Sequence, residues 1–361
     1  MRRLKISHWL LATGIVCHAA VFADQPVERV RYDDHRLVQV TLTSQEDIET
    51  MLRISRDHWS EGIGIGTFPF RVAPENMAAL EKSGLSFEIV HDNIQALIDQ
   101  QRPARLAEPR GWFDDYKTYD EIDAYVDMLV ALRPDLVTRL NLGQSIEGRT
   151  IYGMRISNLA EGSDAPAVLF NGTQHAREWI TPMTNMYIAD MLVQAYDTDP
   201  EIQSMVDSVV FYIVPVVNPD GYVYSWDVNR MWRKNRRDNE GACFGVDNNR
   251  NWGVGWGDDA GSSGDPCHWN YRGTAPFSEP ENQAVRDFIL AHPAIVTHID
   301  FHSYGQVILS RYSYITEEPP EPDRTIFRDL NGQMATAIYD VHGETYTAGP
   351  GAMTLYTVSG G

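Results

Sequence analysis

The residues best suited to chemistry are His175 and Glu178, three positions apart in a segment that changes character around them. The apolar run Val168–Phe170 predicts the end of a buried strand. Thr181 followed by Pro182 is typical of an N-cap and a proline at the first helical position. His175 and Glu178 are therefore expected on a strand-to-helix turn, where open α/β sheets place their sites. They either supply two ligands to one metal ion or are one hydrogen-bonded histidine and one solvated glutamate.

A further histidine, His302, directly follows the predicted strand Ile295–Phe301. Carboxyl ends of neighbouring parallel strands lie at the same sheet edge, so His302 can converge with the first pair. Two imidazoles and one carboxylate, with a fourth position open, are the ligand set of a catalytic rather than a structural zinc. The sequence thus predicts one Zn2+ per chain. His298, inside the same strand, is expected to pack or to face a helix.

Arginines are concentrated between these two halves, in the long irregular segment 218–276. Arg230 and Arg233 lie in one block, and Arg250 follows Asn249 in another. A guanidinium binds a carboxylate through two parallel hydrogen bonds. Any single arginine can equally be a surface residue or an ion-pair partner of the many acids. Clustered near a metal, the arginines predict a site for a substrate anion.

The elements that must position these residues follow a βα alternation from residue 111 onward. Apolar spacing predicts helices over 120–132, 183–195 and 281–291, and strands over 137–142, 151–156, 167–170, 209–217 and 295–301. The run 209–217 is almost continuously apolar, as in a central strand that is covered on both faces. We expect an α/β domain with a mixed, largely parallel central sheet and helices on both faces.

Residues 24–105 have the pattern of a separate small α+β unit of the ferredoxin-like kind. Helices are predicted over 45–54 and 76–83, interleaved with about four strands that include 37–42, 69–72 and 85–90. A polar helical tail at 93–101 precedes a linker that reaches about residue 110 and carries three arginines and two prolines. The linker either joins two domains only or is also cut by an activating protease. We favour the cut, after Arg105 or Arg110.

The first 23 residues have the features of a secretory signal peptide: a basic start, a short apolar stretch and small residues before Asp24. No later segment approaches the length of a transmembrane helix. The formal net charge of −20 should repel nucleic acid and anionic membranes, so neither is expected as a partner. The protein is therefore predicted to be secreted and extracellular.

The cysteines agree with export. Cys17 would leave with the signal peptide, so Cys243 and Cys267 remain as an even pair in an oxidising compartment. A bridge between them would close a loop of about 25 residues and contribute roughly 3 kcal/mol. The alternative, two metal-binding thiolates, is disfavoured because further ligands with suitable spacing are missing nearby.

With these motifs the chain resembles the zinc metallocarboxypeptidases of the carboxypeptidase A and B type, which are secreted proenzymes. The resemblance runs from about Val38 to Gly361. Carboxypeptidase A is itself a known case of the zinc site with two histidines and one glutamate. The matching blocks are His175-Ala-Arg-Glu-Trp-Ile, Asn229-Arg-Met-Trp-Arg-Lys-Asn, Gly245-Val-Asp-Asn-Asn-Arg-Asn-Trp, His302-Ser-Tyr-Gly-Gln and Thr354-Leu-Tyr-Thr-Val-Ser-Gly-Gly.

The resemblance implies a role for each matched residue. His175, Glu178 and His302 would bind zinc, and Arg233 would polarise the scissile carbonyl. Asn249, Arg250 and Tyr356 would hold the terminal carboxylate of a peptide. Arg177, Tyr304 and Arg230 would line outer subsites, and Cys243 and Cys267 would form the family's disulfide. The implied partners are peptide or protein C termini and an activating trypsin-like protease, with the protein a monomer.

One departure concerns the end of the chain. The family's general-base glutamate and the floor of its specificity pocket lie beyond the tyrosine block, and this chain stops at Gly361. We expect the sequence to be a fragment of a longer protein; the alternative is a true truncation. Small residues at Ser313 and Gly351 favour basic C-terminal residues (Lys or Arg) over apolar ones. A non-catalytic homologue that binds peptide C termini is the alternative function.

Overall fold

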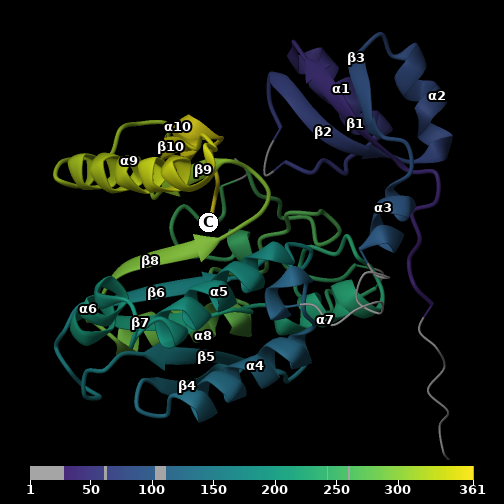
Figure 1. Ribbon diagram of the computed structural model, residues 1–361. Helices are drawn as coiled ribbons and strands as arrows, with labels where there is room; N and C mark the ends of the chain where they lie inside the picture. The colour runs from purple at the N-terminus through teal and green to yellow at the C-terminus, as the bar shows by residue number, and fades with distance from the viewer. Residues whose placement is uncertain (1–27, 61–62, 102–110, 242, 259–260, 361) are drawn as a thin grey trace, which may run out of the picture.

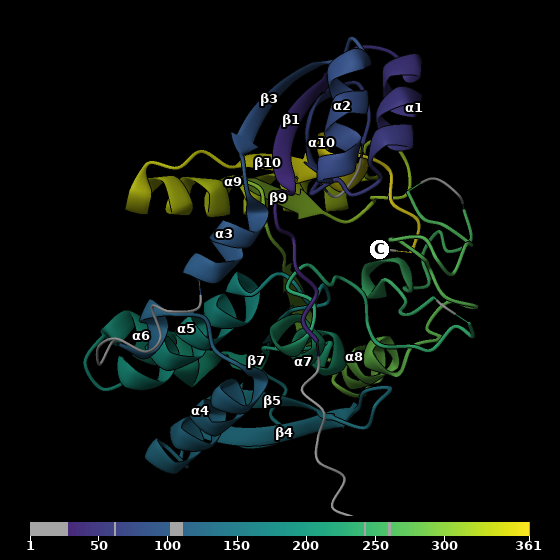
Figure 2. The same cartoon turned by 90° about the vertical axis from the view of Figure 1, so that its right-hand side faces the viewer.

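The computed structural model describes residues 28–60, 63–101, 111–241, 243–258 and 261–360. The expected signal peptide and nearly all of the expected cleavable linker lie outside these residues. A small N-terminal unit sits across one end of a larger unit, and helix α3 (Ile94–Gln100) lies between them (Figures 1 and 2).

The small unit is an antiparallel three-stranded sheet with two helices. Its strand order is β2–β1–β3, with β1 Arg36–Leu42, β2 Gly66–Val72 and β3 Ser86–His91. Helix α1 (Gln45–Ile54) starts at a capping box between Ser44 and Asp47, and α2 (Pro74–Lys82) begins with a proline. Inward side chains of β1 and β2 pack against both helices. The expectation of about four strands was wrong, because the segment around His58 meets β2 through a single bridge, to Phe70.

The large unit contains a mixed five-stranded sheet, which confirms the predicted α/β class. Its strand order is β4–β5–β7–β6–β8. The strands are β4 Val137–Gln144, β5 Thr150–Ile156, β6 Ala167–Gly172, β7 Val210–Val214 and β8 Ile295–Phe301. Strand β6 pairs in parallel with both β7 and β8, whereas the other two ladders are antiparallel. Strand β7 is shorter than the predicted 209–217 and ends just before Pro215, which has no N–H for the ladder.

Helices cover both faces of this sheet, again as predicted. On one face a core joins the sheet to α4 (Tyr119–Leu132), α5 (Ile180–Gln194), α6 (Pro200–Ser208) and α7 (Pro219–Asp227). On the other face a second core joins it to α8 (Pro280–Ala291). The sequence patterns did not predict the short helices α6 and α7, whose N-caps are Asp199 and Asn218. The described residues also include two 3-10 turns, η2 (Trp112–Asp114) and η3 (Asn248–Arg250).

The last part of the chain forms a small layer next to the end of β8 (Figure 1). It consists of the parallel pair β9 (Val307–Ser310) and β10 (Thr347–Pro350), the 20-residue helix α9 (Asp323–His342) and the single turn α10 (Gly351–Thr354). Many apolar side chains of α9 are exposed, such as Ile326 at 56% and Val341 at 70%. Among the described helices, α9 included, none combines the length and the apolar character needed to cross a membrane.

Candidate metal centre and cleft

The turn that follows β6 is tightly packed. A side chain on Gly172 would meet Asn185 at 2.8 Å, so glycine is required there. Thr173 has a φ of 62°, which is rare for a β-branched residue, and its hydroxyl donates to the carbonyl of Pro215. The turn leads directly into α5, which places His175 and Glu178 at the carboxyl end of a central strand.

The predicted start of this helix was wrong by two residues. Helix α5 begins at Ile180, and its N-cap, Trp179, makes no side-chain cap bond. Thr181 lies inside the first turn, where its hydroxyl donates to the carbonyl of Glu178. Proline is compatible with the whole first turn because those N–H groups have no partner within the helix, so Pro182 did not mark the start.

His175, Glu178 and His302 converge on one point. His175 Nδ1 is 2.8 Å from Glu178 Oε1, and His302 Nδ1 is 3.2 Å from Glu178 Oε2. The two Nδ1 atoms are 3.1 Å apart. Ligands about 2.0–2.1 Å from a tetrahedral zinc are separated from one another by roughly 3.3 Å, so the two Nδ1 atoms and one carboxylate oxygen of Glu178 suit such an ion. Within the described residues, they form the one group of His, Cys, Asp or Glu side chains found close enough together to hold a metal.

Each imidazole meets a carboxylate at its other nitrogen. His175 Nε2 is 3.2 Å from Asp247 Oδ1, and His302 Nε2 is 2.8 Å from Asp300 Oδ2. Such outer carboxylates orient metal-binding histidines. Neither aspartate was predicted from the sequence to be part of the site. Asp300 carried a usable signal, because it is two residues before His302 and alternate strand residues share a face.

The charges of the centre suit a cation. Burial would raise the pKa of Glu178, but His175 and His302 outweigh it and lower that pKa to about 2. Burial would lower the pKa of His302, but Asp300 and Glu178 outweigh it and raise the pKa well above its usual value. The Glu178 carboxylate therefore stays ionised beside a His302 ring that holds its proton, and a bound divalent cation would displace that proton.

Arg233 is joined to the metal centre through Asp247. Its Nε and Nη2 atoms lie 3.1 and 3.0 Å from Asp247 Oδ2, while the other oxygen of Asp247 contacts His175. The Arg233 side chain is 5% exposed and Asp247 is fully buried. Burial would raise the pKa of Asp247, but the charges of Arg233, His175 and Arg250 keep it below its usual range.

The three residues expected to bind a carboxylate also lie together. Arg250 donates from Nε to the carbonyl of Gly261 at 2.7 Å and from Nη2 to the hydroxyl of Tyr356 at 3.2 Å. Its Nη1 atom donates to the carbonyl of Asn249, and Asn249 Nδ2 is 3.5 Å from His302 Nε2. Arg250, Asn249 and Tyr356 thus form one group at the edge of the metal centre.

The expected outer-subsite residues are more dispersed. Arg177 lines a cavity together with Arg233. Arg230 lies over the ring of Trp179 at 3.6 Å and donates to the carbonyl of Arg177, which braces the metal-binding turn. Tyr304 is 67% exposed and lines neither this cavity nor the second one described below.

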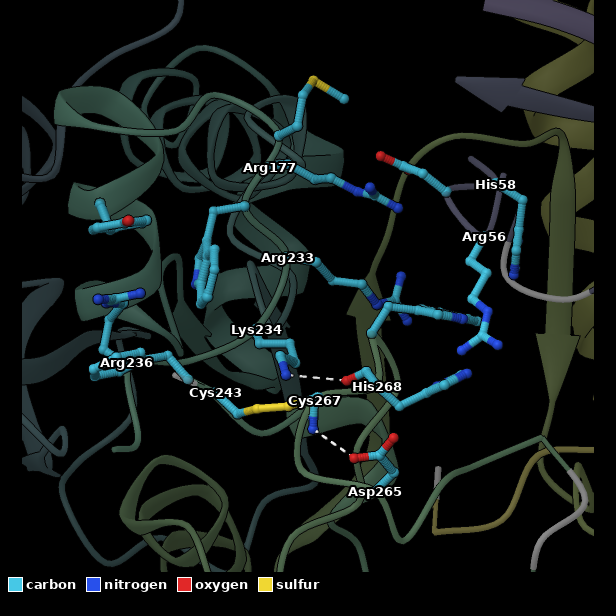
Figure 3. Close-up of a pocket in the computed structure, with 16 residues that line it drawn as sticks. Arg56, His58, Arg177, Arg233, Lys234, Arg236, Cys243, Asp265, Cys267 and His268 are labelled. Atoms are coloured by element: carbon cyan, nitrogen blue, oxygen red, sulfur yellow. Dashed lines mark hydrogen bonds between the residues drawn. A yellow bond between two sulfur atoms is a disulfide. The ribbon is translucent and has the colours of Figure 1, made fainter. Parts of the chain in front are cut away.

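The small unit covers this cleft. A cavity of about 690 Å³ is lined by Arg56, Asp57 and His58 of the small unit and by Arg177 and Arg233 of the large one (Figure 3). His58 also contributes to a second cavity, of about 740 Å³, whose wall includes Tyr356.

Several contacts hold the two units together. The His58 ring packs edge-on against Trp269, with centroids 4.6 Å apart, and Arg233 lies over the same Trp269 ring. Burial lowers the pKa of His58 to about 4, so its ring is neutral at neutral pH. Tyr32 donates a hydrogen bond of 2.7 Å to Asn229. The covering unit thus contacts the residues that flank the metal centre.

The predicted disulfide is confirmed. Cys243 and Cys267 are bonded, with Cα atoms 4.9 Å apart, and both line the wall of the first cavity (Figure 3). The bridge ties down the long irregular segment that carries Arg233 and Arg250.

Fold and site together define a metalloenzyme whose cleft lies under an N-terminal unit. A family model described as "Zinc carboxypeptidase" matches residues 122–361, and one described as "Carboxypeptidase activation peptide" matches residues 38–101. The chain belongs to the zinc carboxypeptidase family and carries the activation peptide of its zymogens.

Relatives support this assignment over nearly the whole chain. Carboxypeptidase A1 of Rattus norvegicus is 35% identical, covering 100% of this chain and 86% of the relative. Carboxypeptidase B of Bos taurus is 36% identical, covering 82% of this chain and 71% of the relative. The crystal structure of carboxypeptidase A from Helicoverpa armigera has a TM-score of 0.80 at 30% identity and covers 91% of this chain and 84% of that one. That of thrombin activatable fibrinolysis inhibitor has a TM-score of 0.84 at 27% identity and covers 91% and 86%.

Proposed function

We propose that the protein is a secreted proenzyme whose large unit hydrolyses the C-terminal peptide bond of peptides and proteins. Residues 1–23 would be the signal peptide, 24–105 the pro-domain and 111–361 the catalytic domain. The observation that carries this proposal is the convergence of His175, Glu178 and His302 beside two buried arginines. An exopeptidase must recognise a free terminal carboxylate as well as a peptide bond, and this arrangement offers groups for both.

Different residues of the chain bind the terminal carboxylate, polarise the scissile carbonyl and hold the metal. Arg250, Asn249 and Tyr356 bind the terminal carboxylate, because a guanidinium, an amide and a hydroxyl can all donate to it. Arg233 donates to the scissile carbonyl oxygen and stabilises the charge that develops there. His175, Glu178 and His302 would hold the zinc ion, which would supply a Lewis acid and lower the pKa of a bound water. Arg177 and Tyr304 would contact the substrate farther from the scissile bond.

The small unit acts as the pro-domain that blocks the cleft. His58 and its neighbours occupy space beside Arg177 and Arg233 that a peptide would need. Cleavage by a trypsin-like protease after Arg105 or Arg110 would release the unit from the catalytic domain. Secretion follows from the signal-peptide features and agrees with the disulfide between Cys243 and Cys267.

Small residues in the pocket that receives the C-terminal side chain support a preference for Lys and Arg. Ser313 and Gly351 are adjacent: a Cβ atom on Gly351 would approach Ser313 Oγ to 2.1 Å. Both residues are small, and bulkier residues at these positions would obstruct a long basic side chain. Peptides ending in Lys or Arg should therefore be preferred to those ending in Phe or Leu, and a clear preference for Phe would contradict this part of the proposal.

Binding and hydrolysis test the function separately. The purified protein is loaded with zinc and treated with trypsin, and its affinity is measured for a peptide with a free C terminus and for its C-terminal amide. We expect the free acid to bind at least about 10-fold more tightly, since a bidentate Arg–carboxylate contact contributes several times RT. The variant R250A should lose this difference. Equal binding of acid and amide would contradict the proposal.

Hydrolysis of the same free-acid peptide, measured with the full-length gene product so that the family's general-base position is included, distinguishes the two candidate functions. Release of the C-terminal amino acid, lost in H302A, supports the exopeptidase. Selective binding of the free acid without release would instead support the non-catalytic homologue that binds peptide C termini.

A further inference from the structure

Asp300 occupies an unusual position at the end of β8. Its Oδ2 atom accepts from His302 Nε2 at 2.8 Å and also contacts Gln174 Nε2, and its Oδ1 atom accepts from Asn171 Nδ2 at 2.7 Å. Three donors from two strands thus meet on one carboxylate that is 18% exposed. Gln174 directly precedes His175, so Asp300 links the two segments that carry the metal-binding histidines.

We propose that Asp300 is a positioning residue for zinc, which holds His302 in its binding orientation and fixes the distance between the two halves of the site. This inference rests on the proposed zinc centre. Asp300 itself does not touch the metal position. It acts through the ring of His302 and through Gln174.

The direction of the hydrogen bond between His302 and Asp300 decides which nitrogen of His302 is available to bind zinc. A carboxylate accepts only, so Nε2 carries the proton that it donates to Asp300. Nδ1, which lies 3.2 Å from Glu178 Oε2 and 3.1 Å from His175 Nδ1, is then the nitrogen left to bind zinc once its own proton has been displaced. Without an acceptor at Nε2, the imidazole can rotate or take the other tautomer, and the three ligand atoms no longer converge.

His302 needs this support more than His175 does. The side chain of His175 is fully buried, so packing restricts its ring in addition to the contact with Asp247, whereas the side chain of His302 is 26% exposed. His302 also follows β8, which among the described strands pairs only with β6. The carboxylate of Asp300 therefore supplies an orientation that the surrounding packing does not impose.

The donors on Asp300 are themselves held in place. Asn171 Oδ1 contacts Nε2 of His298, and Gln174 Oε1 accepts from Trp252 Nε1 at 3.0 Å. His298, Asp300 and His302 are alternate residues that share one face at the end of β8. This network fixes the position of the carboxylate relative to the β6 turn, and a shift of Asp300 would move His302 relative to His175.

Zinc affinity tests the proposal without relying on catalysis. Metal-free protein is titrated with zinc against a chromophoric chelator for the wild type, D300A and D300N. Loss of an outer carboxylate costs about 10- to 100-fold in metal affinity, so we expect that loss for D300A. D300N should retain part of the affinity, because the amide oxygen can still accept from Nε2. D287N on α8 changes the same charge at an exposed pair with Arg286 and should leave the affinity unchanged.

Further readouts separate positioning from a general loss of structure. Metal-free D300N should match the wild type in thermal midpoint but gain less on zinc addition, and the visible spectrum of its Co2+ form should differ. Affinities of D300A and D300N within twofold of the wild type, or an unchanged Co2+ spectrum in D300N, would overturn the proposal. If D300A does not fold, the isosteric D300N decides. A wild type that does not bind zinc would overturn the proposed centre as well.

Discussion

The two halves of the metal centre differ in how they are built. His175 and Glu178 lie on a turn between a central strand and a buried helix, and their side chains are 0% and 3% exposed. His302 follows the outer strand β8, its side chain is 26% exposed, and the chain continues into a layer whose longest helix is largely exposed. One half is held by packing on all sides, whereas the other depends on a few polar contacts.

This difference shows that the surrounding protein can hold two candidate ligands of the same kind in place to different degrees. The turn after β6 is braced by the stacked rings of Trp179 and Trp226, 3.7 Å apart, and by the Ala176 N–H, which donates to the carbonyl of Arg233. The β8 half is joined to it through Glu178 and Asp300. We therefore expect substitutions in the buried half to change both folding and metal binding, and those in the exposed half to change mainly metal binding.

The largest effect should come from removing one histidine from each half. H175A and H302A should both weaken zinc binding by more than about 1,000-fold, because each removes a ligand from a three-ligand set. In metal-free protein, H175A should also cost about 2–4 kcal/mol in urea unfolding, since it leaves a cavity and removes partners of Glu178 and Asp247. H302A should cost less than about 1 kcal/mol. Equal losses of stability in H175A and H302A would contradict the proposed difference between the buried and the exposed half of the site.

Two arginines of the cleft wall, one buried and one partly exposed, provide a second test. R233A removes the partner of buried Asp247 and should cost about 3 kcal/mol of unfolding free energy. R177A alters a partly exposed residue at the cavity wall and should cost less than about 1 kcal/mol. Chemical denaturation of both variants at neutral pH measures the difference. A larger loss in R177A would mean that the cleft surface, not the buried pair, stabilises this region.

The pH dependence of the unfolding free energy tests another buried carboxyl group, Glu281. Glu281 on α8 accepts from the N–H of Ile146 and from Asn235, and burial raises its pKa to about 7 from a usual value of 4.5. Between about pH 4.5 and 7 the folded state therefore keeps the proton on Glu281, whereas the unfolded chain has lost it. The contribution of Glu281 to the free energy of unfolding falls as pH rises from about 4.5 to 7, by about 3 kcal/mol at most, and is constant above pH 7.

The variant E281Q isolates this contribution because an amide cannot ionise. Its unfolding free energy, measured from pH 4.5 to 8, should lack the decrease that the wild type shows between pH 4.5 and 7. Parallel curves for the two proteins would show that Glu281 is ionised in the folded state throughout that range.

The smallest effect is expected in the exposed C-terminal layer. Ile326 on α9 is 56% exposed, so I326S should change the unfolding free energy by less than about 0.5 kcal/mol. The matched change in α5, M186S, removes a fully buried side chain and should cost at least about 2 kcal/mol. A large loss in I326S would show that α9 is covered in solution.

Much of the fold could be predicted because its signals are local. Apolar spacing located α1, α4, α8 and the strands of both sheets to within a few residues. Predictions failed where context overrides local pattern. Thr181 and Pro182 suggested a helix start that the packing of the turn moved to Ile180, and α6 and α7 are too short to show a clear period.

The residues of the site also divide into those suggested by local sequence and those added by other information. The types and spacing of His175, Glu178 and His302 suggested a zinc centre, because strand ends and turns are encoded by neighbouring residues, and the family resemblance then implied that these three are the ligands. The family resemblance added Arg233, Asn249, Arg250 and Tyr356, which the structure brings to the same edge.

The tertiary structure alone decided how these residues are oriented and covered. Asp247 meets His175 across 72 positions of sequence, and Gln174 meets Asp300 across 126. His58 reaches Trp269 from a different unit. Such contacts depend on how the whole chain packs, and local periodicity carries no information about which distant side chain meets which. The sequence by itself determined the candidate ligands and the elements that bear them; folding decided which of their nitrogens converge, which carboxylates contact them and what covers the cleft.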